Sequence, residues 1–232
     1  TAPAQTLFDV VRKLPDSADV QLEFLPENQR LSIQAGRSRF ALPTLPASDF
    51  QTMTKDEGSV QFSLDANDLK RLIDKTRFAI STEETRYYLN GVYLHIAETD
   101  GAKKLRAVAT DGHRLALSEI DAPAGSESLA GVIIPRKAVA EVRRLIDGFD
   151  GEIKLSASEA KIVFTAGRAI LTTKLIDGSF PDYARVIPQN NDKTMKVENV
   201  ALEKAVDRVA TVSAERSRSV KLSLESDKVV LT

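Results

Sequence analysis

The chain repeats itself along its length, and this internal repetition is the feature that most constrains its fold. The opening segment TAPAQTLFDVVRKLP returns as IPRKAVAEVRRLID, with Pro3 aligned to Pro135. A second segment, FSLDANDLKRLIDKTRFAIS at 62–81, returns as VENVALEKAVDRVATVS at 197–213. Each unit reads as one helix with several strands, which is too little to bury a core alone. Units of this kind are stabilised by their neighbours, so the sequence predicts a repeat array.

The order of the units along the chain predicts a fragment. If the opening segment is called B and the second segment A, the order is B, A, B, A. This order gives one complete domain flanked by two half domains. We therefore expect an A unit to be missing before Thr1 and a B unit to be missing after Thr232.

The hydrophobic pattern predicts an α+β fold. Helical spacing of apolar residues indicates helices at 5–14, 68–78 and 136–146, with Asn67 as the N-cap of the second. Alternating or strongly apolar runs predict strands, at 20–25, 30–35, 38–43, 60–64, 87–89, 92–97, 104–110, 113–120, 152–156, 161–165 and 169–175. The polar segment 51–58 is a predicted linker. Helices alternating with such runs favour antiparallel sheets that carry their helices on one face.

Composition excludes several classes of function. The chain is 42% hydrophobic and 28% charged, which is typical of a folded protein, and no apolar run approaches a membrane span. The absence of cysteine excludes disulfides and thiolate chemistry and fits a reducing cytoplasm. With only two histidines as well, we expect no metal and no cofactor. Because the net charge is −1, any contact with nucleic acid must come from a local basic face.

The segment Thr110-Asp111-Gly112-His113-Arg114 is the most enzyme-like stretch because it brings an acid, a base and a cation together. Asp-Gly is also a strong signal for a two-residue hairpin turn between the flanking apolar runs. A catalytic histidine needs a nucleophile or a metal in reach, which neighbouring turn residues do not supply. A plain turn and the rim of a binding site are therefore favoured, and catalysis stays open as a third interpretation.

Aromatic residues beside an arginine suggest a contact with nucleic acid. Arg86, Tyr87 and Tyr88 follow the polar run TEET and could touch a phosphate backbone or stack on bases. Packing within a strand, with one tyrosine inward and one outward, is the alternative. The segments AGRSRF and AGRAIL lack the glycine spacing of a phosphate loop. His95 alternates with apolar neighbours and is predicted to be a packed or surface strand residue.

The predicted helices share a basic bias away from their apolar stripes. The cations selected from these helices as candidate DNA contacts are Arg12, Lys70, Arg71, Arg136, Lys137, Arg143, Lys204 and Arg208. A solvated helix face often looks like this, so one helix alone carries no information. If the array curves with its helices on the concave side, these cations converge there. That arrangement would track phosphates without reading bases.

Five motifs carry a resemblance to a known family. They are GRSRFALPTLP at 36–46, RYYLNGVYL at 86–94, VATDGHRLA at 108–116, IIPRKAV at 133–139 and LIDGSFPDYARVIP at 175–188. Together with the repeat, they make the chain resemble the bacterial DNA polymerase III β subunits, the β sliding clamps, over essentially all its length. The members of this family have three domains of two units each, and two chains close head to tail into a ring with helices inside and sheets outside.

The resemblance implies a domain plan and a set of sites. Residues 1–58 would be the second half of domain 1, 59–188 all of domain 2, and 189–232 the first half of domain 3. A pocket for short peptide motifs would include Leu89, Thr110, Gly112, His113, Arg114, Leu115, Pro181, Arg185 and Val186. The residues themselves, independently of the resemblance, suggest Arg86, Tyr87 and Tyr88 as DNA contacts beside the helix cations listed above. The homodimer interface would include Phe40, Leu42, Thr211 and Val212.

The function that the resemblance implies is a non-enzymatic processivity factor in the cytoplasm. Its partners would be double-stranded DNA, the DNA polymerase III core, the clamp loader, and other polymerases and repair proteins with clamp-binding motifs. No membrane partner is expected. Two other classes stay open from the residues themselves. One is an enzyme that uses Asp111, His113 and Arg114, and the other is a peptide-binding scaffold with no role on DNA.

Overall fold

The computed structural model describes residues 1–49, 59–212, 219–225 and 228–232, without the side chain of Val212. The chain forms two compact units, Thr1–Phe180 and Pro181–Thr232. The predicted linker at 51–58 lies outside the described residues. The first unit comprises an N-terminal part (residues 1–49) and a central part (residues 59–180), and the second is the C-terminal unit.

The N-terminal part is one helix with a three-stranded antiparallel sheet, as the repeat predicts. Its elements are α1 (Ala4–Val11), β1 (Val20–Leu25), β2 (Arg30–Ala35) and β3 (Ser38–Pro43), with short 3₁₀ helices at Pro26–Asn28 and Ala47–Asp49. The strand order is β1-β2-β3, so β3 lies at an edge. Alternate residues of β2 are buried, among them Ile33 at 0% exposure. Gly36 adopts φ 56° in the turn that joins β2 to β3.

The central part contains a unit of each kind. The first unit comprises β4 (Val60–Asp65), α2 (Ala66–Asp74), η3 (Arg77–Ala79), η4 (Tyr87–Leu89), β5 (Gly91–Thr99), β6 (Ala102–Thr110) and β7 (Leu115–Asp121). The second comprises β8 (Val132–Pro135), α3 (Arg136–Leu145), β9 (Glu152–Ala157), β10 (Lys161–Ala166) and β11 (Ala169–Lys174).

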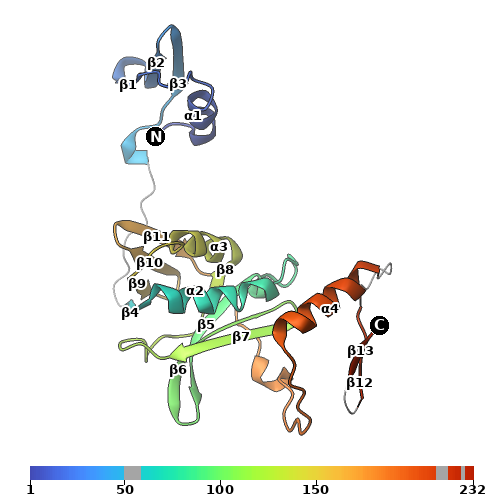
Figure 1. Cartoon of the computed structure of the whole chain (residues 1–232). Helices are drawn as coiled ribbons and strands as arrows, with labels where there is room; N and C mark the ends of the chain where they lie inside the picture. The colour runs from blue at the N-terminus through green and yellow to red at the C-terminus, as the bar shows by residue number, and fades with distance from the viewer. Residues whose placement is uncertain (50–58, 213–218, 226–227) are drawn as a thin grey trace. The chain divides into compact units, whose positions relative to one another are not determined.

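The two central units exchange their first strands, which ties them into one domain. The sheet orders are β7-β6-β5-β8 and β11-β10-β9-β4. Strand β8 of the second unit therefore pairs with β5 of the first, and β4 of the first pairs with β9 of the second. All these pairs are antiparallel, and Figure 1 shows the two sheets with α2 and α3 packed on them.

A shared core fills the space between the helices and the two sheets. Leu72 of α2 and Val142 of α3 are each 1% exposed, and Phe164 of β10 is also 1% exposed. These side chains belong to one continuous cluster of buried residues contributed by both units. Because neither unit buries such a cluster alone, the exchange of strands and the packing of α2 against α3 produce the stable domain.

The predicted N-cap of α2 and the predicted strand at 87–89 were wrong. Asp65, not Asn67, caps α2: its carboxylate accepts a hydrogen bond from the backbone N–H of Asn67 at 2.8 Å. Residues 87–89 form a 3₁₀ helix instead of a strand, because the backbone of Leu89 bonds locally. Its N–H donates to Arg86 O at 2.9 Å, and its carbonyl accepts from Ser81 N at 3.1 Å.

Aromatic stacking anchors the end of the central part to its sheet. The Phe180 ring stacks on Tyr93 at a centroid distance of 4.8 Å, and Tyr93 stacks on His95 at 4.6 Å. Ile176 N also donates to Ile133 O at 3.0 Å. Burial lowers the pKa of His95, and the nearby charge of Arg106 acts in the same direction. His95 is thus a packed strand residue, as predicted.

The C-terminal unit has one helix and a two-stranded antiparallel sheet. Its elements are η5 (Tyr183–Val186), α4 (Asn199–Val212), β12 (Leu222–Leu224) and β13 (Val229–Leu231). This order of a helix followed by strands is again the repeat unit. In the part of the chain that the structure describes, every helix is too short or too polar to cross a bilayer.

Candidate functional site

The Asp111–Arg114 segment is a closed turn between β6 and β7, which we call the pocket turn. The Asp111 carboxylate accepts hydrogen bonds from the backbone N–H groups of His113 at 2.9 Å and Arg114 at 3.0 Å. Thr110 Oγ1 donates to Arg114 O at 2.7 Å and accepts from Gly112 N at 3.1 Å. Gly112 adopts φ 90°, which a side chain would strain. The hairpin was predicted correctly, but its turn is longer than two residues.

The hydrogen bonds and charges around Asp111 indicate a structural role for this residue. Its pKa is lowered, chiefly by the hydrogen bond from the His113 backbone, with further bonds from Arg114, while burial opposes the shift. The Arg114 guanidinium also pairs with this carboxylate at 3.1 Å. An acid committed to these donors is a poor general base. Among the described residues, no three His, Asp or Glu side chains gather as a metal site would require.

An exposed aromatic ring extends the edge of the pocket turn. Phe78 of η3 is 56% exposed, and the Arg114 guanidinium lies 5.6 Å from its ring centroid. Phe78 was not predicted as a site residue because it was assigned to the end of a helix predicted to run to residue 78. The helix stops earlier, at Asp74, and buried Thr76 donates its hydroxyl to Leu72 O at 2.7 Å.

The 81–90 loop lies against the pocket turn. Leu89 is 3% exposed, so its side chain is buried beneath this loop. A Cβ atom added to Gly112 would lie 2.6 Å from Arg86 NH1, which places the Arg86 guanidinium over the backbone of the pocket turn. The same guanidinium donates from Nε and NH2 to Glu83 Oε2 at 2.9 and 2.7 Å. The pKa of Arg86 is raised, mainly by this hydrogen bond.

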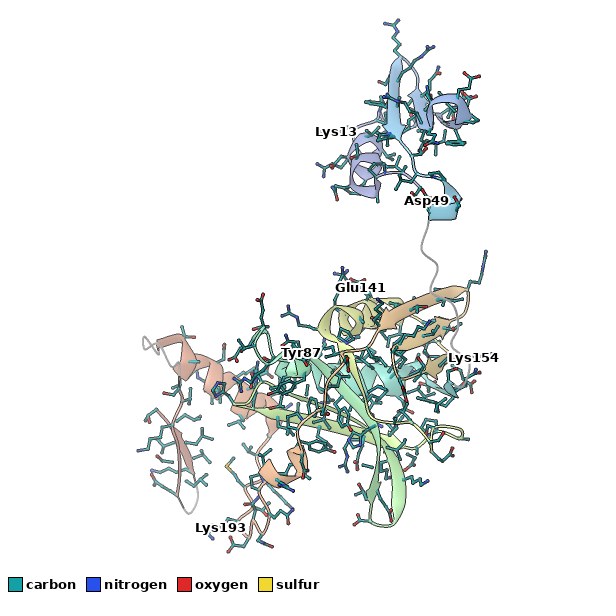
Figure 2. All side chains as sticks on the ribbon, turned by 180° about the vertical axis from the view of Figure 1, so that it is seen from behind. Lys13, Asp49, Tyr87, Glu141, Lys154 and Lys193 are labelled. Atoms are coloured by element: carbon teal, nitrogen blue, oxygen red, sulfur yellow. The ribbon has the colours of Figure 1, made fainter. Side chains whose placement is uncertain are left out.

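Two of the predicted DNA-contact groups meet in the central part. Tyr87 is 53% exposed and packs edge to face with Tyr88 at 5.8 Å (Figure 2 labels Tyr87). The loop that carries both rings ends at Asn90, whose carbonyl accepts from Arg136 N at 2.9 Å at the start of α3. Arg136 and Lys137 are exposed, and neither has an ion-pair partner among the described residues. This surface therefore combines aromatic rings with free cations.

Arg143, predicted as a DNA contact, is instead engaged between helices. Its Nε donates to both carboxylate oxygens of Asp74 at 3.0 Å, and its NH1 donates to Asp147 at 2.9 Å. Its side chain is 18% exposed. Arg143 joins α3 to the end of α2, and its guanidinium is committed to two carboxylates.

We expect Arg143→Ala to lower the stability of the central part and to leave DNA retention unchanged. The melting temperature should fall by about 2–4 °C, measured calorimetrically. Arg143 lowers the pKa of Asp147, so their pairing stabilises above the ordinary aspartate pKa of 3.8 and is lost as the pH falls through the lowered value. The difference from the parent chain should therefore shrink under acid conditions. A large loss of DNA retention with unchanged stability would contradict this assignment.

The other predicted helix cations differ in their ion pairing and in their exposure to solvent. Arg12 pairs with Asp9 and Arg71 with Asp68, each at 3.3 Å and in an exposed setting, where such pairs are weak. Lys70 is half-buried. Lys204 and Arg208 are exposed on α4 in the C-terminal unit. Because α1 and α4 belong to separately described parts, convergence of the helices on one concave face stays a prediction.

Three of the predicted pocket residues lie in the C-terminal unit. Pro181, Arg185 and Val186 start the C-terminal unit, where Arg185 pairs with Asp182 at 2.7 Å and Val186 is 69% exposed.

Of the predicted dimer contacts, Phe40 is 38% exposed on edge strand β3, whereas Leu42 is 7% exposed and faces inward. Thr211 is exposed on α4, and the side chain of Val212 lies outside the described residues.

Comparison with protein families gives matches over nearly the whole chain. The N-terminal domain model of the DNA polymerase III beta subunit matches residues 1–54. The central domain model matches residues 63–182, and the C-terminal domain model matches residues 184–232. The three matches follow the order of the domains in the family.

Individual relatives agree with these matches. The beta sliding clamp of Caulobacter vibrioides is 59% identical over 232 residues, which is 100% of this chain and 62% of that protein. A crystal structure of the C. crescentus beta sliding clamp, with PEG bound to its putative beta-motif tethering region, matches with a TM-score of 0.92 and 58% identity. The match covers 99% of this chain and 61% of that chain.

A sliding clamp from Bartonella birtlesii bound to griselimycin matches with a TM-score of 0.89 and 48% identity, over 99% of this chain and 61% of that one. The chain therefore spans about three fifths of the length of these relatives.

Proposed function

Because the chain belongs to the DNA polymerase III β subunit family, we propose that it acts as a sliding clamp. It encircles duplex DNA without reading its sequence, and tethers the polymerase to the template. The observation that carries the proposal is the ordered match of the family's N-terminal, central and C-terminal domain models along this chain. The α+β repeat supports it, because a clamp needs a helix-lined inner surface and sheets that continue from one domain to the next.

The DNA-facing surface of the central part is the exposed start of α3 together with the 81–90 loop. Arg136 and Lys137 supply free positive charge, and Tyr87 and Tyr88 supply rings beside it. Phosphate contacts of this kind hold a duplex without reading its sequence. A net charge of −1 agrees with sliding, since a strongly basic protein would bind tightly at every position.

Charge reversal tests the DNA surface. We expect the double variant Arg136→Glu/Lys137→Glu to weaken DNA retention equally on different sequences. The slope of the logarithm of the binding constant against the logarithm of the salt concentration (the salt slope) should become shallower by about 2. The matched control is Lys154→Glu/Arg168→Glu, which makes the same change in net charge on β9 and on the β10–β11 turn; Figure 2 labels Lys154. If both variants lose retention equally, the effect is one of net charge and the surface is wrongly assigned.

The second part of the proposal is a peptide pocket built on the pocket turn. Leu89, Thr110, Gly112 and Leu115 form its floor and wall, with His113 and Arg114 at the edge. Apolar walls with a few polar groups suit an extended peptide that carries hydrophobic anchors. Pro181, Arg185 and Val186 stay assigned to it from the family resemblance. We expect griselimycin, which the Bartonella clamp binds, to compete with such a peptide.

The proposed partners follow from these two surfaces. They are double-stranded DNA, the DNA polymerase III core, the clamp loader, and other polymerases and repair proteins with clamp-binding motifs. The protein acts without catalysis, in the cytoplasm and as a homodimer. In the dimer, edge strand β3 with Phe40 of one chain meets the end of α4 near Thr211 of the other.

A further inference from the structure

We infer that Glu83 is a positioning residue of the peptide pocket: its carboxylate holds the Arg86 guanidinium over Gly112 and so fixes the pocket turn. This inference rests on the proposed peptide-binding function. Glu83 acts through Arg86 and the turn, with no contact of its own to the peptide. It was not among the residues that sequence analysis selected.

Because the Arg86 guanidinium is rigid, its bonds to Glu83 also set the position of the nitrogen that lies over the pocket turn. Nε and NH2 of Arg86 both donate to one oxygen of Glu83. The guanidinium is planar and rigid, so fixing two of its nitrogens also fixes the third. That third nitrogen, NH1, is the atom that lies over Gly112. If Glu83 releases Arg86, the group that covers the turn is free to rotate away from it.

The backbone of Glu83 is itself anchored, so its carboxylate acts from a defined position. Its N–H donates to Ser81 Oγ at 3.1 Å, and its carbonyl accepts from Asn90 Nδ2 at 3.1 Å. Ser81 is 1% exposed, so the anchor belongs to the core. The backbone and core of the domain thus hold Glu83, Glu83 holds Arg86, and Arg86 covers the turn.

This arrangement changes the role predicted for Arg86. With two nitrogens committed to Glu83 and the third against the turn, Arg86 has little to offer a phosphate. The phosphate contacts of this region then come from Arg136 and Lys137. The Glu83–Arg86 pair is partly exposed, with side chains 50% and 39% accessible, so salt should weaken it.

The test compares two neighbouring charge removals, Glu83→Gln and Glu84→Gln. Glu84 is exposed and has no ion-pair partner among the described residues, so its variant controls for the lost charge. The probe is a fluorescently labelled extended peptide with hydrophobic anchors. At low salt we expect Glu83→Gln to bind it about fivefold more weakly than Glu84→Gln. The gap should close at high salt, because screening already weakens the pair in the parent chain.

Two further measurements keep the inference separate from the proposed function. Amide hydrogen exchange in the unbound chain should be faster over residues 111–114 in Glu83→Gln than in Glu84→Gln, whether or not a peptide binds. Arg86→Ala should bind the peptide as weakly as Glu83→Gln and keep the parent salt slope for DNA. A parent chain that binds no peptide would refute the pocket, whereas equal exchange in the two Gln variants would refute the role of Glu83.

Discussion

Gly91→Ala is expected to destabilise the central part by about 3 kcal/mol. Gly91 opens β5, is buried, and pairs with Pro135 of β8. An added Cβ would collide with the backbone oxygen of Ile134 and lie 2.9 Å from its carbonyl carbon. It would also lie 3.0 Å from Cγ2 of Ile133. A backbone group cannot rotate away as a side chain can, so β8 must move, and β8 is the strand that joins the second unit to the first.

The measurement is calorimetric unfolding combined with hydrogen exchange over β5 and β8. Gly101→Ala is the control, because an added Cβ there meets nothing within 4 Å and the only cost is its φ of 74°. That cost should be about 1 kcal/mol. If Gly91→Ala is no less stable than Gly101→Ala, the close approach of the two strands does not limit this domain.

Elements with strong local sequence signals were the easiest to predict. Strands 30–35 and 38–43 have the predicted bounds, because apolar alternation and Gly36 define both strands and the turn. The α3 helix was also predicted to within one residue. Signals of this kind lie within a few residues of each other, so one sequence is enough to reveal them.

Elements defined by distant partners could not be predicted in the same way. The run Tyr87–Leu89 has strand-like composition, but no strand among the described residues pairs with it, and a local turn satisfies its backbone. Arg143 looks like the other helix cations until the fold brings Asp74 to it from 69 positions away. The hydrophobic pattern places charges on a helix face, but only the tertiary structure separates free cations from paired ones.

The candidate site shows the same division. The pocket turn was visible in the sequence, since Asp-Gly between apolar runs predicts a hairpin. The contacts that hold it in shape were not visible. Glu83 appears in a polar run with no distinguishing pattern, and Phe78 lies where a helix was predicted to continue. Both are assigned by their contacts with Arg86 and Arg114.

Gly112→Val is expected to weaken peptide binding by roughly 50-fold and to leave the fold nearly as stable as in the parent chain. Gly112 adopts φ 90°, which a β-branched residue reaches only at a cost of about 2–3 kcal/mol. The new side chain would also displace Arg86 NH1, which lies 2.6 Å from the Cβ position. The turn then relaxes into another shape, and binding must supply the energy to restore it, which reduces affinity by a corresponding factor. Stability changes little because the turn is exposed and can rearrange.

Gly101→Val is the control that distinguishes backbone strain in another turn from backbone strain in the pocket turn. Gly101 lies in the β5–β6 turn with φ 74°, so valine meets a comparable penalty there. We expect Gly101→Val to bind the labelled peptide like the parent chain in a fluorescence titration. Gly112→Ala should fall between the parent and Gly112→Val, because alanine tolerates positive φ better than a β-branched residue. A Gly112→Val chain that binds with full affinity would show that the peptide does not depend on the shape of this turn. The pocket would then have to be sought elsewhere in the protein.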